Sequence, residues 1–191
     1  MCSGWRAWAA VAVLLLGTAV HHVRGYAHED LSGHAAGSDD AYISYRYARS
    51  LASGEGLTFN PGERVEGYST LLFVLLIAPA CLVLRDAAIH PFAVVLSAAF
   101  AAAAVVLLHR RLRAIDPGPA GTWGAALLAA SPLLWLWTAS GMETALVTLL
   151  QVALWAEVAG GGKRLRQFAT HADGLGALAG EKEAHWRHGL R

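Results

Sequence analysis

The chain has 191 residues, of which 55% are hydrophobic and 15% are charged, and its formal net charge is +1. Its mean hydropathy is +0.42. Soluble domains carry about 25% charged residues, so this composition argues against an ordinary soluble globular protein. The small net charge gives no indication of a nucleic-acid partner. The apolar residues come in blocks, which predicts a multi-pass protein of the cell membrane.

The first apolar block runs from Trp5 to Val20, with Arg6 near its start. A basic start followed by an apolar run also describes a signal peptide. The residues that follow the block, His21 to Arg24, contain no clear small-x-small cleavage motif. We therefore expect an uncleaved first helix whose amino end lies in the cytoplasm.

Four further apolar blocks follow along the chain. They are Tyr68–Leu84, Phe92–Leu108, Trp123–Ala139 and Ala145–Ala159. Together the blocks predict an all-α, polytopic transmembrane helical bundle with four to five apolar segments. We expect residues 1–166 to form this membrane-embedded region and residues 167–191 to form a polar, disordered tail.

The long polar passage between the first two blocks, residues 24–67, is expected to form the first outer loop. Within it, Ser38–Ser53 predicts a helix that its first residue can cap and that Gly54 can end. Asp39 and Asp40 fall in the first turn, where the helix dipole favours carboxylates. The mixture of aromatic and arginine side chains is typical of an amphipathic helix at the membrane–water interface.

Two transmembrane arrangements fit these blocks. If every block crosses the membrane, the basic cluster His109–Arg113 lies outside, which opposes the positive-inside rule. If Tyr68–Leu84 instead dips into the membrane or lies along it, with a break at Pro79, the basic cluster becomes cytoplasmic. Glu143 then emerges on the same face as Asp39 and Asp40. We favour this second arrangement.

The polar loop carries the residue types that sugar transfer requires. A carboxylate must accept the proton of the acceptor hydroxyl, and Asp39 or Asp40 can do so. Guanidinium groups match the oxygens of a departing phosphate, and three arginines are candidates for this role. The full set of candidate donor-phosphate or substrate-binding residues is Tyr42, Arg46, Arg49, Arg64 and Glu66.

Four tyrosines in this loop or directly after it offer flat faces for a sugar ring or an isoprenoid chain. They are Tyr42, Tyr45, Tyr47 and Tyr68. Glu143 is the one acidic residue between the last two blocks, and a carboxylate near mid-bilayer costs about 2.5–3.5 kcal/mol, so such residues usually have a functional reason or lie at an interface.

The same residues also have interpretations that involve no catalysis. Two aspartates in a first turn are more often a helix cap than a catalyst, and arginines near a membrane often bind lipid headgroups. Adjacent aspartates could also bind a divalent cation, with His28 or His34 adding to the site, although no metal-ligand spacing is present. The sequence therefore assigns no metal residues and leaves a divalent-cation cofactor open.

Three ordered motifs carry a resemblance to a known family. They are D-D-A-Y-I-S-Y-R-Y-A-R at 39–49, G-L-T-F-N-P-G-E-R-V-E-G-Y-S-T at 56–70 and S-G-M-E-T-A-L at 140–146. Together they resemble the amino-terminal part of bacterial GT-C glycosyltransferases. The likeness is to actinobacterial arabinofuranosyltransferases of the cell wall and to the dolichyl-phosphate-mannose protein mannosyltransferase superfamily, and it covers about residues 5–160.

The resemblance implies a membrane enzyme that moves a sugar from a polyprenyl-phosphate donor to a glycan, lipid or protein acceptor on the extracytoplasmic face. It implies a catalytic aspartate at Asp39 or Asp40 and a second acidic residue at Glu143. Members of the family are several times longer, so we expect a truncated or split product that lacks part of the donor site. The alternatives are a non-catalytic membrane protein or inactive fragment, and a membrane factor acting in envelope or flagellar control.

Overall fold

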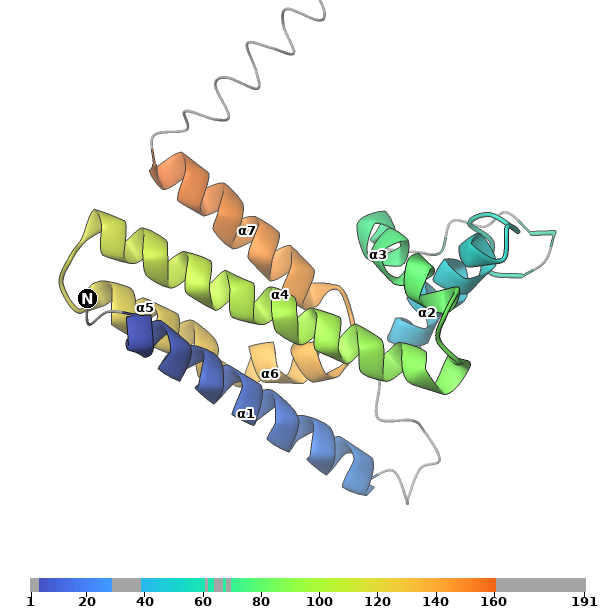
Figure 1. Cartoon of the computed structure of the whole chain (residues 1–191), viewed down its shortest axis with the longest axis horizontal. Helices are drawn as coiled ribbons and strands as arrows, with labels where there is room; N and C mark the ends of the chain where they lie inside the picture. The colour runs from blue at the N-terminus through green and yellow to red at the C-terminus, as the bar shows by residue number, and fades with distance from the viewer. Residues whose placement is uncertain (1–3, 29–38, 61, 64–66, 68–69, 161–191) are drawn as a thin grey trace, which may run out of the picture. The chain divides into compact units, whose positions relative to one another are not determined.

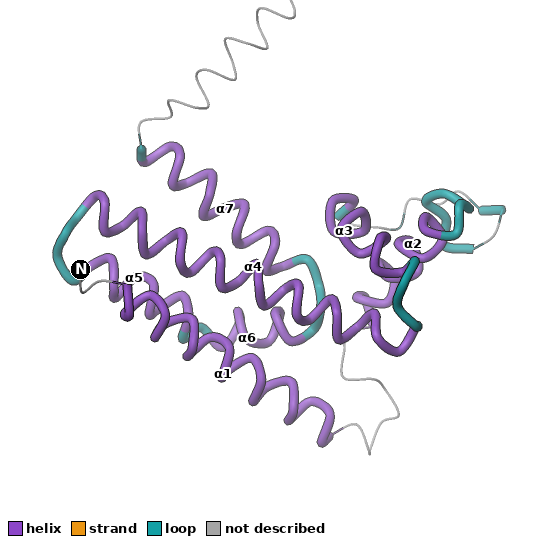
Figure 2. The backbone as a smooth tube through the Cα atoms, in the orientation of Figure 1, coloured by secondary structure: helices purple, strands orange, loops and turns teal. Residues whose placement is uncertain are grey.

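The structure, a computed structural model, describes residues 4–28, 39–60, 62–63, 67 and 70–160. The regular structure of these residues is helical throughout (Figure 2), which confirms the all-α fold class. The helices are α1 (Gly4–His28), α2 (Asp39–Ala52), α3 (Leu71–Cys81), α4 (Asp86–Ile115), α5 (Ala120–Ala129), α6 (Pro132–Ala139) and α7 (Thr144–Ala159), as labelled in Figure 1.

The chain divides into two compact units, residues 1–152 and 153–191. The second unit is described only over residues 153–160, which include the end of α7. The fold given below is that of the first unit. The boundary that the sequence predicts at residue 166, and the polar tail beyond it, lie outside the described residues.

Among the described residues, two helices, α1 and α4, are long and apolar enough to cross a membrane, over Arg6–Arg24 and Asp86–Ile115. The second predicted block contains only the 11-residue helix α3. At 1.5 Å per residue α3 spans about 17 Å, well short of the ~30 Å hydrocarbon core. The helices thus support membrane association through α1 and α4, and four to five crossings stay a prediction.

Helix α4 is longer than the apolar block that predicts it. The block covers residues 92–108, whereas the helix runs from Asp86 to Ile115 and so includes the basic cluster in its last turns. An acidic residue in the first turn and arginines in the last turns both suit the helix dipole. Arg113 also donates to the carbonyl oxygens of Pro117 and Gly118, which holds the following loop against the helix end.

α1 and α4 run in opposite directions (Figure 1). His22, late in α1, stacks on His90, early in α4, with ring centroids 6.0 Å apart. Small and apolar side chains of both helices bury one cluster together with α5 and α6, among them Leu14 of α1 and Val105 of α4. The start of α1 and the end of α4 therefore lie at the same end of this helix pair.

The fourth apolar block, 123–139, is two helices rather than one. α5 ends at Ala129, and Pro132 begins α6 because proline has no N–H to continue the ladder of the preceding helix. The indole of Trp135 donates a 2.7 Å hydrogen bond to the carbonyl oxygen of Ala129, one of those freed at the α5 end. α1 fits closely here, since a Cβ at Gly17 would lie 2.3 Å from the Trp135 ring.

α2 begins and ends within one residue of the predicted helix. Gly54 follows it with φ +82°, the left-handed conformation expected of a glycine after a helix end. α3 packs along α2, and the buried cluster between them includes Tyr47, Phe73 and Ile77. Ile89 of α4 belongs to the same cluster, so α2 and α3 are anchored on the first turns of α4.

Candidate functional site

Tyr45 joins three parts of the fold. It lies on α2 and is 6% exposed. Its hydroxyl donates a 2.8 Å hydrogen bond to the carbonyl oxygen of Gly141, in the turn between α6 and α7, and lies 3.3 Å from Nδ1 of His90 on α4. Gly141 has φ +71°, a left-handed conformation that favours glycine. A Cβ at that position would lie 2.4 Å from the Tyr45 hydroxyl, so the contact requires a residue without a side chain.

The hydrogen bonds of Tyr45 also determine the tautomer of His90. A tyrosine hydroxyl has one proton, and a carbonyl oxygen can only accept, so the proton of Tyr45 points at Gly141. Nδ1 of His90 must therefore be the donor to the Tyr45 oxygen. In the neutral ring Nε2 is then an acceptor, and this buried nitrogen has no hydrogen-bond partner among the described residues.

Aromatic rings surround this polar contact. His90 stacks on His22 of α1 and on Tyr42 of α2, with centroids 6.0 Å and 5.9 Å away. Tyr42 meets Tyr45 edge-on at 5.4 Å. Such ring pairs add about 0.5–1.5 kcal/mol beyond the area they bury, so the cluster fixes the three helices together at this point.

The Tyr45–Gly141 hydrogen bond connects the two segments that carry the acidic motifs. Asp40 is exposed in the first turn of α2, five residues before Tyr45, and Glu143 is half-buried, two residues after Gly141. Asp39 is the first residue of α2, and its side chain is not among those described. The hydrogen bond joins positions 96 residues apart in sequence, so it brings the start of α2 and the 140–143 turn to one region.

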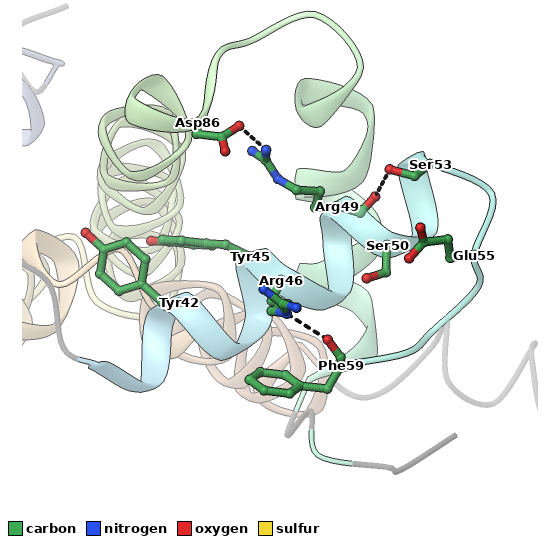
Figure 3. Close-up of a pocket in the computed structure, with 9 residues that line it drawn as sticks. All are labelled: Tyr42, Tyr45, Arg46, Arg49, Ser50, Ser53, Glu55, Phe59 and Asp86. Atoms are coloured by element: carbon green, nitrogen blue, oxygen red, sulfur yellow. Dashed lines mark hydrogen bonds and ion pairs between the residues drawn. The ribbon is translucent and has the colours of Figure 1, made fainter. Parts of the chain in front are cut away.

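A groove of 530 Å³ runs along the exposed face of α2 (Figure 3). Three of the predicted substrate-binding residues line it, namely Tyr42, Arg46 and Arg49. Nε of Arg46 donates a 2.7 Å hydrogen bond to the carbonyl oxygen of Phe59, and its guanidinium carbon lies 5.3 Å from the centre of the Phe59 ring. Arg46 is therefore held in place at the groove while remaining exposed.

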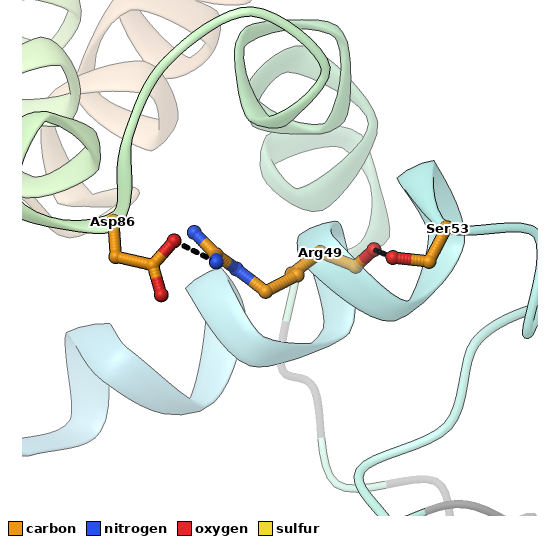
Figure 4. A network of polar contacts seen from close by, with 3 residues as sticks. All are labelled: Arg49, Ser53 and Asp86. Atoms are coloured by element: carbon orange, nitrogen blue, oxygen red, sulfur yellow. Dashed lines mark hydrogen bonds and ion pairs between the residues drawn. The ribbon is translucent and has the colours of Figure 1, made fainter.

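Arg49 forms an ion pair with Asp86, the first residue of α4 (Figure 4). Their side chains are 40% and 81% exposed, so the pair contributes at most about 1 kcal/mol to stability. To bind the donor phosphate as predicted, Arg49 must exchange the Asp86 carboxylate for the phosphate. Ser53 donates to the backbone carbonyl oxygen of Arg49 at 3.0 Å, in the last turn of α2.

Two further predicted residues, Arg64 and Glu66, lie outside the described residues. The same holds for Tyr68 and His34, and for the side chain of His28. Within the part of the chain that the structure describes, no group of three or more His, Cys, Asp or Glu residues is close enough to hold a metal ion.

The expectation that four tyrosines offer flat faces to a ligand is wrong for two of them. Tyr45 is buried as described above, and Tyr47 is 1% exposed with its hydroxyl accepting a 3.0 Å hydrogen bond from the N–H of Gly67. The Tyr45 ring packs against His90 of α4 and the Tyr47 ring against Phe59 of the loop after α2, and both belong to the buried cluster that holds α2 on the fold. Tyr42 is 41% exposed and remains the described candidate for stacking.

Residue patterns alone did not single out His90, Gly141 or Asp86 as part of the site. Gly141 lies in the S-G-M-E-T motif, which indicated a turn but did not indicate that Tyr45 contacts it. His90 lies just before the apolar block 92–108, and a single histidine at that place does not indicate a functional role. Their roles depend on contacts across the fold that no local pattern encodes.

Comparison of the chain with protein-family models, with curated proteins and with solved structures finds no match. The function is therefore inferred from the geometry of this site and from the motifs of the sequence.

Proposed function

We propose that the chain is the membrane-embedded region of a glycosyltransferase that uses a polyprenyl-phosphate sugar and works on the extracytoplasmic face. The acceptor is a glycan, lipid or protein of the cell envelope. The hydrogen bond from Tyr45 to Gly141 is the observation that carries this proposal, because it joins the two acidic motifs. A site built from two distant acidic motifs is what the resemblance to GT-C transferases leads one to expect.

The antiparallel arrangement of α1 and α4 supports the outer location of the site. Arg6 near the start of α1 and Arg110, Arg111 and Arg113 near the end of α4 lie at one end of the pair. The positive-inside rule assigns that end to the cytoplasm. The Tyr45–Gly141 contact, beside His90 in the second turn of α4, then belongs to the opposite side.

In the proposed reaction the acceptor oxygen attacks the anomeric carbon of the donor sugar. The new C–O bond forms as the bond from that carbon to the phosphate oxygen breaks, and the polyprenyl phosphate leaves with the electron pair. Asp39 or Asp40 takes the proton of the acceptor hydroxyl. Glu143 positions the acceptor from the opposite motif.

The arginines of the groove receive the leaving phosphate. Arg46, anchored by Phe59, presents a planar guanidinium to the solvent side of α2. Arg49 contributes once the phosphate displaces Asp86, which costs little because that pair is exposed. The ring of Tyr42, at the same groove, offers a face for the sugar.

Transfer from a labelled donor tests the proposal. The chain is reconstituted in proteoliposomes with radiolabelled polyprenyl-phosphate arabinose or mannose, and release of the sugar to water or to an added glycan is measured. The double substitution Asp39→Asn with Asp40→Asn, and the single substitution Glu143→Gln, should each lower release at least a hundredfold, as expected for loss of a general base or a positioning carboxylate. Asp116→Asn is the matched control, since Asp116 is exposed beyond the other end of α4.

Binding of the donor lipid separates catalysis from recognition. Polyprenyl phosphate alone should bind the wild-type chain, and Arg46→Gln should weaken that binding. A chain that neither binds polyprenyl phosphate nor releases sugar from any donor would refute the proposal.

The alternative is a non-catalytic membrane protein. One observation favours it: both described arginines of the groove already have partners in the fold, Arg46 with Phe59 and Arg49 with Asp86. In that case the polar cluster serves only to hold α2 on α4. The binding experiment decides, because a purely structural cluster predicts that polyprenyl phosphate leaves the melting temperature unchanged.

A further inference from the structure

A hollow lies between α1 and α5 at the end of the bundle where α1 begins. It has a volume of 340 Å³, and Val13 and Ala126 contribute to its apolar walls. Arg6, which is exposed, stands at its mouth. The hydroxyl oxygen of Thr122, on its wall, is buried and has no hydrogen-bond partner among the described residues.

A second hollow continues along α1 toward its other end. It has a volume of 470 Å³ and lies between α1 and α6. Gly17 and Trp135 belong to its lining, and the exposed residues His21 and Arg24 stand at its far end. The absence of a side chain at Gly17 brings the Trp135 ring against α1 and shapes this part of the surface.

The two hollows are neighbours along α1, because Val13 lines both. We call the pair the furrow of α1; Arg6 lines the first hollow and Arg24 the second. Arg6 and Arg24 are separated by eighteen residue steps, or about 27 Å of helix at 1.5 Å per residue. This length is close to the ~30 Å hydrocarbon thickness of a bilayer. The furrow thus matches a membrane in length, in apolar character and in the placement of its charges.

We propose that the furrow binds two anionic phospholipids, one from each leaflet. Each lipid lays an acyl chain in one half of the furrow. The phosphate of one contacts Arg6, and the phosphate of the other contacts Arg24 and His21. This proposal is independent of the proposed transferase activity, since the furrow is lined by α1, α5 and α6 and shares no residue with the groove on α2.

Charge complementarity favours phospholipid over a second transmembrane helix as the occupant. Helix ends at membrane surfaces commonly carry Lys or Arg, which would repel Arg6 on the cytoplasmic side. Lipid phosphates are anionic at both surfaces, and a guanidinium near the surface is worth about 1 kcal/mol toward an anionic headgroup. An acyl chain also adapts to the irregular wall that a rigid helix would have to match.

Counting bound lipids by native mass spectrometry tests the inference. The full chain is purified in nanodiscs of phosphatidylglycerol or of phosphatidylcholine, released into mild detergent and weighed. Two phosphatidylglycerol molecules should be retained, and phosphatidylcholine, whose headgroup has no net charge, should bind each site about fivefold more weakly. Arg6→Gln and Arg24→Gln should each weaken one of the two sites about fivefold. Val13→Trp, which fills the junction of both hollows, should weaken both.

Val95→Trp is the matched control, because Val95 is 69% exposed on α4 and lines neither hollow. Equal retention of the two lipids would overturn the proposal, as would equal lipid counts for the Val13 and Val95 variants. A dimer of the chain that Val13→Trp dissolves and Val95→Trp preserves would also overturn it, since a second helix would then be the occupant. The counts require no sugar donor, so they stand whether or not the chain transfers sugar.

Discussion

The hydroxyl of Tyr45 donates to the carbonyl oxygen of Gly141 at 2.8 Å across 96 residues of sequence. This contact is buried and shared with His90, so three separate elements depend on one oxygen atom. Inside a protein a polar network of this kind is specific when complete and costly when one member is removed. The contact therefore holds α2, α4 and the 140–143 turn together as well as forming part of the candidate site. Substitutions here test both its structural and its functional role.

Removal of the Tyr45 hydroxyl should destabilise the fold. Tyr45→Phe leaves the Gly141 carbonyl and the Nδ1–H of His90 without their partner, which costs about 1–3 kcal/mol for buried groups. Unfolding by denaturant in detergent micelles measures the loss. Ser53→Ala is the control, because it removes an exposed hydroxyl whose partner, the Arg49 carbonyl oxygen, still accepts from the Ser53 N–H. Equal effects of the two substitutions would contradict a buried role for Tyr45.

Alanine at Gly141 should cost more stability than alanine at Gly54. Both positions have positive φ, +71° and +82°, so both substitutions carry the left-handed penalty of about 1–2 kcal/mol. A Cβ at Gly54 meets no atom within 4 Å, whereas one at Gly141 would lie 2.4 Å from the Tyr45 hydroxyl. The extra cost at Gly141 should be about 1–3 kcal/mol, as for other overpacked sites.

A double substitution separates the steric clash with Tyr45 from the other causes of the Gly141→Ala penalty. In the Tyr45→Phe background the clashing oxygen is absent, so Gly141→Ala should then cost less than it does in the wild-type chain. Melting temperatures of the four chains give the coupling. Strict additivity would show that the Gly141 penalty does not come from the Tyr45 oxygen, leaving backbone conformation and the His90 ring, 3.2 Å from such a Cβ, as its causes.

Cys81 should react slowly with thiol reagents. Burial raises the pKa of its thiol, and the positive charge of Arg49 lowers that pKa and so opposes part of the shift. The thiolate is the reactive form, so alkylation should be slower than for a free thiol and should accelerate as pH rises. Arg49→Gln removes the opposing charge, raises the pKa further and should slow the reaction at pH 8.

The rate is measured with iodoacetamide in a chain that carries Cys2→Ser. Arg85→Gln is the control, because it removes an exposed arginine of the same region without taking away the charge of Arg49. A faster reaction in the Arg49 variant than in the wild-type chain would contradict this prediction. It would mean that the ion pair with Asp86 limits access of the reagent to the thiol, rather than that Arg49 lowers the thiol pKa.

Local patterns predicted α2 well. Its limits, its closing glycine and the shared face of Tyr42, Arg46 and Arg49 all follow from periodicity and from the preferences of helix ends. The division of 123–139 into two helices was missed, although Pro132 marks it, because apolar content alone suggested one span. Continuous hydrophobicity does not distinguish one long helix from two short ones.

The candidate site was predicted in its motifs but not in its contacts. That Asp40 and Glu143 share one face stays a prediction; the hydrogen bond from Tyr45 to Gly141 joins the segments that carry them. Tyr45 was expected to face a ligand and is instead buried, because an aromatic residue on an amphipathic helix can serve either side. The pairing of Arg49 with Asp86 joins residues 37 positions apart and depends on how α2 is placed against α4.

Cysteine labelling in intact cells tests the orientation. In a background that lacks Cys2 and Cys81, Ser53→Cys at the end of α2 should react with a membrane-impermeant maleimide. Ala114→Cys at the end of α4 should react only after the membrane is permeabilised, because the arginines beside it hold that end in the cytoplasm. Both positions are exposed, so access within the fold does not limit either reaction.

Asp116→Cys, exposed just beyond α4, is the control for the inner side and should behave as Ala114→Cys does. Gly121 is unsuitable for a label, since a Cβ there would lie 2.8 Å from the backbone nitrogen of Arg113. Labelling of Ala114→Cys and Asp116→Cys in intact cells would place the end of α4 outside. The groove on α2 would then face the cytoplasm, where an extracytoplasmic sugar transfer could not occur.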